Sequence, residues 1–160
     1  MHPIRLLVGV AAACLAAAST SPAASQAGAP PTISARSFTG GSAAVTVTGT
    51  VEFTQDVPLN AQASFGDGEK TWIQFGASGA ETPNALLTYG DGEVGVSVGR
   101  GRFVATAGIM VGDTPQCSGS AEVTAALVSG HYSCPGIVSY DAKTGKMGKV
   151  NIDVRFTAKS

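Results

Sequence analysis

The residues closest to a catalytic set surround His131, the only histidine after residue 27. Ser133 follows two residues later and Asp141 lies at the next turn, so a Ser/His/Asp arrangement can be drawn. Such chemistry needs a serine presented on a strand-to-helix elbow, and the sequence has no helical segment to form one. We therefore predict no catalytic residues, with His131 as a half-exposed residue on a strand. A hydrolase with an unfamiliar site is the alternative.

The tetrapeptide Gly-Asp-Gly-Glu occurs twice, once after Phe65 and once after Tyr89. Alternating carboxylates could bind calcium, but each copy offers two carboxylates where Ca²⁺ takes about six to eight oxygens. Asp-Gly between alternating apolar residues is also a strong hairpin signal. The sequence therefore predicts two hairpin turns and no metal site.

Trp72 and Tyr89 are candidates for an aromatic ligand face, on which a sugar ring could stack. The alternative is that both rings pack in the core or pair across a hairpin. An exposed row containing Trp72 would favour a carbohydrate ligand, and a large apolar cavity would favour a lipid.

Cys117 and Cys134 are predicted to form a disulfide. The third cysteine, Cys14, lies in the N-terminal apolar run, so export leaves one even pair in an oxidising compartment. Closing this loop should stabilise the fold by about 3 kcal/mol. Metal binding with His131 is the alternative, but it provides three ligands where structural zinc takes four.

The strands that carry these residues follow from alternation of apolar and polar side chains. Ser42–Thr54 and residues 150–156 show it most clearly. Shorter candidate strands lie between them: 61–65, 71–75, 86–89, 94–98, 103–109, 121–127 and 131–140. The sequence therefore predicts an all-β fold, an antiparallel β-sandwich or partly closed barrel of about eight to nine strands.

The N-terminus reads as a secretory signal peptide. Arg5 precedes an apolar run, Leu6 to Ala18, which is too short to span about 30 Å of hydrocarbon. Cleavage after Ala27 would leave residues 28–41 as a flexible Ala/Pro/Ser/Gly-rich tether and residues 42–160 as the folded domain. The alternative is a degenerate lipobox, in which the cut precedes Cys14 and a lipid is attached to its sulfur.

Charge limits the partners. Residues 28–160 carry nine basic and eleven acidic side chains, without a basic stripe. Nucleic acid is therefore not expected as a partner. We expect membrane contact only through a lipid on Cys14, no cofactor, and a glycan, lipid or protein as partner.

The C-terminal half resembles the nineteen-kilodalton lipoprotein antigen family of mycobacteria and other actinobacteria. The resemblance rests on short segments between residues 85 and 157: 85–88, 97–99, Gly130-His131-Tyr132, Gly136, Lys149, Ile152 and Val154. It implies an exported, tethered β-rich domain displayed at the cell envelope, without known catalytic activity, and favours lipidation of Cys14. The expected function is therefore surface display or binding, outside the cell or on its membrane. The alternatives are a carbohydrate- or lipid-binding module and the hydrolase named above.

Overall fold

The protein is an all-β domain, seen in a computed structural model that describes residues 31–77, 81–90, 93–109 and 116–160. Eleven strands form one large antiparallel sheet, in the order β1-β4-β5-β6-β7-β8-β10-β11-β2-β3, with β9 paired to β10. Their bounds are β1 Arg36–Ser37, β2 Gly40–Gly49, β3 Phe53–Pro58, β4 Phe65–Gly66, β5 Thr71–Phe75, β6 Asn84–Gly90, β7 Glu93–Arg100, β8 Phe103–Ile109, β9 Ser118–Val123, β10 Leu127–Asp141 and β11 Lys146–Lys159, with a 3₁₀ turn at Ala61–Ala63.

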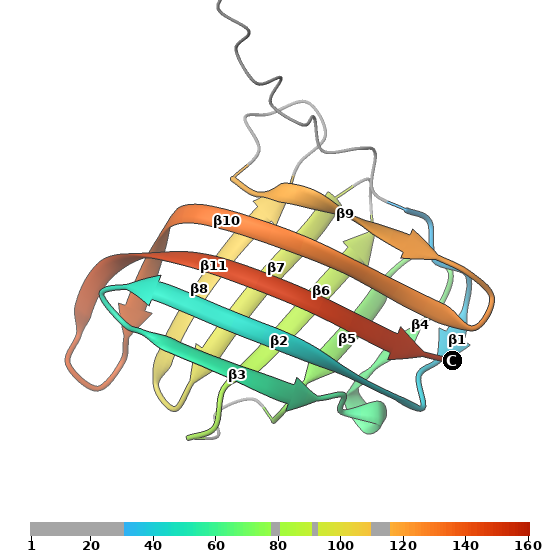
Figure 1. The fold of residues 1–160 in the computed structure, drawn as a ribbon, viewed down its shortest axis with the longest axis horizontal. Helices are drawn as coiled ribbons and strands as arrows, with labels where there is room; N and C mark the ends of the chain where they lie inside the picture. The colour runs from blue at the N-terminus through green and yellow to red at the C-terminus, as the bar shows by residue number, and fades with distance from the viewer. Residues whose placement is uncertain (1–30, 78–80, 91–92, 110–115) are drawn as a thin grey trace, which may run out of the picture.

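The sheet folds over into two layers without closing into a barrel (Figure 1). Strands β9, β10, β11, β2 and β3 lie in front, and β5 to β8 cross behind them. The fold occurs within β10, whose first part pairs with β9 and whose last residues pair with β8. An extra residue bulges out of β10 between Cys134 and Ile137, and Gly136 there has a φ of 68°. A bulge with glycine in this conformation bends a strand, so it turns the sheet between layers.

The core lies between the layers and follows the alternation expected from the sequence. In β11, residues Val150, Ile152, Val154 and Phe156 are buried, and Asn151, Asp153, Arg155 and Thr157 alternate with them on the outer face. Valines dominate the remaining inward positions, and the rings of Tyr132 and Phe156 stack at 6.2 Å. The predicted fold class is therefore confirmed. Within the described residues, no helix is long and apolar enough to cross a membrane.

The predicted strand Ser42–Thr54 is wrong, because the chain turns back after Gly49 to form the hairpin of β2 and β3. Val47 pairs with Phe53 across this hairpin. Five residues lie between the two, which keeps both at the same phase of the alternation, so the apolar pattern continues through the turn and resembles one long strand. This hairpin and the short β1 raise the strand count above the expected eight to nine.

The folded domain begins earlier than the predicted boundary at Ser42. Of the predicted tether, residues 28–30 lie outside the described residues, but Ile33 and Phe38 are buried and β1 pairs with β4. The Arg36 guanidinium donates a 2.8 Å hydrogen bond to the carbonyl oxygen of Thr124 between β9 and β10. Burial of two large apolar side chains outweighs the polar, small-residue composition on which the tether prediction rested.

Two smaller strand predictions also shift. Ala61–Ala63 forms the 3₁₀ turn rather than a strand. The connection between the candidate strands 121–127 and 131–140 lies earlier than expected, between β9 and β10, where the Thr124 amide donates to the carbonyl oxygen of Leu127. In contrast, β8 occupies the predicted range 103–109.

Candidate functional site

The predicted face shared by Trp72 and Tyr89 does not exist, because the two rings lie on opposite sides of the sheet. Trp72 of β5 pairs with Thr88, whereas Tyr89 of β6 pairs with Thr71. Since neighbouring strand residues face opposite sides, Trp72 points outward and Tyr89 points into the core, where it is 3% exposed.

Trp72 has a different aromatic partner on the outer face. Phe65 of β4 lies directly opposite it, with ring centroids 4.9 Å apart and planes tilted by 32°. The Phe65 side chain is 48% exposed, although aromatic rings usually bury most of their area. Counting outward from the first Gly-Asp-Gly-Glu turn would have found this pair from the sequence.

A hollow of about 330 Å³ lies beside this aromatic pair. Three of its lining residues lie side by side on the outer face: Trp72 of β5, Thr88 of β6 and Gly95 of β7 are paired in register. A Cβ on Gly95 would come within 2.3 Å of the Thr88 hydroxyl, so glycine keeps the floor low. Lys70 and Glu93 also line the hollow. The site therefore combines a flat aromatic wall with a hydroxyl, an ammonium and a carboxylate.

Tyr89 borders the hollow, but its side chain lies in the core. Its hydroxyl is buried and has no hydrogen-bond partner among the described residues. Burial raises the pKa of Tyr89 well above its usual value, and the nearby Tyr132 hydroxyl raises it further without reaching hydrogen-bond geometry. The phenol is therefore neutral over the physiological pH range.

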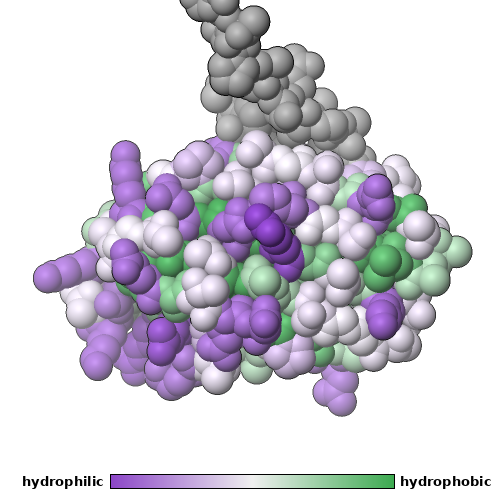
Figure 2. Space-filling view, viewed as in Figure 1, coloured by the Kyte–Doolittle hydropathy of each residue, from purple (hydrophilic) through white to green (hydrophobic). Residues whose placement is uncertain are grey.

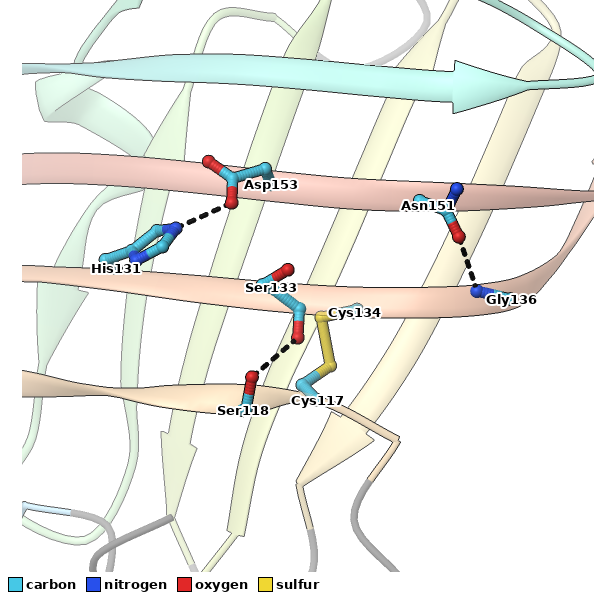
Figure 3. Close-up of a disulfide and its surroundings, with 8 residues drawn as sticks. All are labelled: Cys117, Ser118, His131, Ser133, Cys134, Gly136, Asn151 and Asp153. Carbon is cyan, nitrogen blue, oxygen red and sulfur yellow. Dashed lines mark hydrogen bonds and ion pairs between the residues drawn. A yellow bond between two sulfur atoms is a disulfide. The ribbon is translucent and has the colours of Figure 1, made fainter. Parts of the chain in front are cut away.

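His131 pairs with an aspartate that sequence analysis missed (Figure 3). Its Nε2 lies 2.6 Å from Oδ2 of Asp153, and the two side chains are 45% and 38% exposed. The half-exposed strand position predicted for His131 is thus confirmed. The Arg155 guanidinium lies 3.8 Å from the other Asp153 oxygen, so the outer face of β10 and β11 carries a small charged cluster.

Ser133, His131 and Asp141 do not form a Ser/His/Asp arrangement in the structure. Asp141 accepts hydrogen bonds from the Lys143 and Thr144 amides and from the Thr144 hydroxyl in its own turn. In the described part of the chain, no serine hydroxyl hydrogen-bonds the ring of His131. Among the described residues, the His131–Asp153 pair therefore has no serine hydrogen-bonded to it.

One serine does have the spacing of a nucleophile elbow, which sequence analysis overlooked: Gly95-Val96-Ser97-Val98-Gly99. The structure places Ser97 in the middle of β7, with its hydroxyl 3.0 Å from that of Thr106 on β8. A serine inside a regular strand lacks the sharp turn that exposes a nucleophile. The motif is therefore part of a regular strand and does not present a nucleophile.

The disulfide between Cys117 and Cys134 is present, with a Cα–Cα distance of 4.0 Å (Figure 3). Cys117 directly precedes β9, so the bond ties this edge strand to β10. No cluster of three or more His, Cys, Asp or Glu side chains that could hold a metal occurs among the described residues. Cys14 lies outside them.

The first Gly-Asp-Gly-Glu motif is a hairpin turn, as predicted. Asp67 Oδ1 accepts the amides of Lys70 at 2.7 Å and Glu69 at 2.9 Å. These backbone donors lower the pKa of the Asp67 carboxyl, with Lys70 contributing most. In the second motif Gly90 pairs with Glu93, and residues 91–92 at its tip lie outside the described residues.

Comparison with known protein families, with curated protein sequences and with solved structures finds no match to this chain.

Proposed function

We propose that this chain is an exported, non-enzymatic binding protein whose ligand is a carbohydrate held on the outer face of β4 to β7. One observation carries the proposal: an aromatic pair on the outer face, exposed Phe65 and half-buried Trp72, beside a hollow lined by polar groups. A solvated sheet face does not need two large rings stacked on it, since leaving them in water forgoes their burial.

The chemistry of the hollow fits a sugar ring. The apolar C–H face of a pyranose stacks on an aromatic ring, and its hydroxyls need donors and acceptors at the rim. Thr88, Lys70 and Glu93 offer both kinds of group. The low floor at Gly95 lets a flat ligand approach the sheet. An acyl chain would instead need an enclosed apolar cavity, and packed core residues fill the space between the layers.

Export and display outside the cell form the second part of the proposal. The signal-like N-terminus supports it, and so does the disulfide, because such bonds persist in oxidising compartments. The resemblance to the nineteen-kilodalton lipoprotein antigens favours a lipid on Cys14. The intact mass and N-terminal sequence of the native protein separate a lipidated chain starting at Cys14 from a released chain starting at Gly28.

Binding can be measured at the site itself, because Trp72 is the only tryptophan in the chain. A panel of neutral and acidic polysaccharides is titrated against the protein while tryptophan emission is recorded. Phe65→Ala keeps the reporter and should weaken binding about tenfold, the worth of one aromatic contact. Tyr140→Ala, at a distant exposed ring, is the matched control and should leave binding unchanged. If no polysaccharide changes the emission, or if both variants bind equally well, the proposal is wrong.

A further inference from the structure

A second surface, independent of the aromatic pair, lies at the end of the domain formed by the β7–β8 turn and the β10–β11 hairpin, on the left of Figure 1. Tyr140 on β10 pairs with Val104 on β8 and with Met147 on β11. With Val138 they form an apolar strip, and these are four of the five exposed large hydrophobic residues in the described chain: Val104 50%, Val138 53%, Tyr140 48% and Met147 73%.

Basic side chains surround this apolar strip. Five of the nine basic residues after residue 27 belong to this end: Arg100, Arg102, Lys143, Lys146 and Lys149. Three acidic residues accompany them: Glu52, Glu81 and Asp141. The other described residues include four basic and six acidic side chains. This end is therefore positive, whereas the rest of the described chain is negative, and Figure 2 shows hydrophilic side chains gathered there.

A hollow of about 470 Å³ lies between the two turns, and three of the cations line it: Arg100, Arg102 and Lys143. Two carboxylates, Glu81 and Asp141, also line this hollow. Asp141 accepts hydrogen bonds from its own turn, so the three cations face one carboxylate that is held locally and one that is not. The Arg100 guanidinium is fixed over the Phe53 ring, 5.8 Å from its centroid. The hollow thus has the size and charge to take a phosphate group.

We propose that this end of the domain docks onto an anionic lipid surface. The apolar strip would enter the headgroup boundary while Arg102 and Lys143 bind lipid phosphates. Exposed apolar side chains ringed by Lys and Arg suit such a surface, because burial and attraction to anionic lipids act together. A neutral glycan would use the cations poorly, and a free phosphate would leave the apolar strip in water.

The test is flotation of the exported protein, carrying Cys14→Ser throughout so that no lipid anchor contributes. Vesicles of phosphatidylcholine alone are compared with vesicles containing 30% phosphatidylglycerol, at low and high salt. We expect binding only to the anionic vesicles, with a strong loss at high salt. Arg102→Ala/Lys143→Ala should weaken binding about thirty-fold, since each basic residue near an anionic surface is worth about 1 kcal/mol, or about fivefold in affinity.

Arg155→Ala/Lys159→Ala removes the same charge from β11, away from the two turns, and serves as the matched control. Tyr140→Ser/Met147→Ser should lower binding about tenfold while its salt dependence persists. Equal binding to neutral and anionic vesicles, equal loss in both double-charge variants, or binding of inorganic phosphate without vesicle binding would each overturn the proposal. If a variant does not fold, the salt dependence of vesicle binding by the unsubstituted protein tests the proposal by itself.

Discussion

Opening the disulfide should destabilise the domain by an amount that its loop length sets. Cys117 and Cys134 are 17 residues apart, and closing a loop of this length removes about 3 kcal/mol of chain entropy from the unfolded state. For a domain of this size, that loss corresponds to a fall in Tm of about 10 °C. Little else holds β9, which pairs only with β10 and buries its Ala121 and Val123 only in part.

The assay compares thermal unfolding of the oxidised protein, the reduced protein and the Cys117→Ala/Cys134→Ala variant. Reduction isolates the cross-link, while the variant adds the loss of two buried sulfur atoms, because Cys134 is 0% and Cys117 is 3% exposed. Hydrogen exchange should rise first in Ser118–Val123. The reasoning is refuted if oxidised and reduced protein melt together, or if native protein yields two freely alkylated thiols without reductant.

Four further predictions concern the fold. Val47→Asp should unfold the domain and Thr48→Asp should not, because Val47 is 1% exposed while Thr48 faces water; circular dichroism of both variants checks this. Phe38→Ala should cost about 3–5 kcal/mol in urea unfolding, against no change if residues 31–39 were a loose tether. Gly136→Val should destabilise by about 1–2 kcal/mol through its φ of 68° alone, with Gly136→Asn as the milder control; equal stability of the two would contradict the bulge geometry. The backbone amide of Lys143 and then the Thr144 hydroxyl lower the pKa of Asp141. The ionised carboxylate therefore stabilises the fold fully at pH values above the usual pKa of an aspartate, and this stabilisation is lost as the pH falls through the lowered pKa. Asp141→Asn should therefore flatten the fall of Tm between about pH 4 and pH 2, and an unchanged slope would disprove this.

Sequence alternation predicted most of the sheet because inward and outward residues differ sharply in polarity. It could not locate the β2–β3 turn, because Val47 before the turn and Phe53 after it both fit one uninterrupted alternation of apolar and polar residues. Nor could it place Trp72 and Tyr89, since their faces depend on how β5 pairs with β6. Within one strand, side chains alternate between the two faces of the sheet. Only the pairing register between strands determines which residues of different strands share a face.

The His131–Asp153 pair shows the same limit through a bulge. Asp141 pairs with Lys146 next to the β10–β11 turn, and counting back from there without interruption would put His131 opposite Phe156. The extra residue between Cys134 and Ile137 shifts the register by one, so that His131 faces Arg155 and lies near Asp153. Because the sequence is rich in glycine, one glycine does not indicate where a bulge shifts the register.

The same bulge explains why apolar side chains are exposed at the positive end of the domain. Beyond it, β10 leaves the front layer to pair with β8, so the outer side of the sheet is convex there. The inward residues are covered, with Ile137 4% and Ser139 3% exposed, whereas Val138 and Tyr140 on the outer side are 53% and 48% exposed. A convex apolar surface cannot be covered by the strands that carry it. Its burial therefore requires something other than the described strands, and the surrounding lysines and arginines favour an anionic surface for that role.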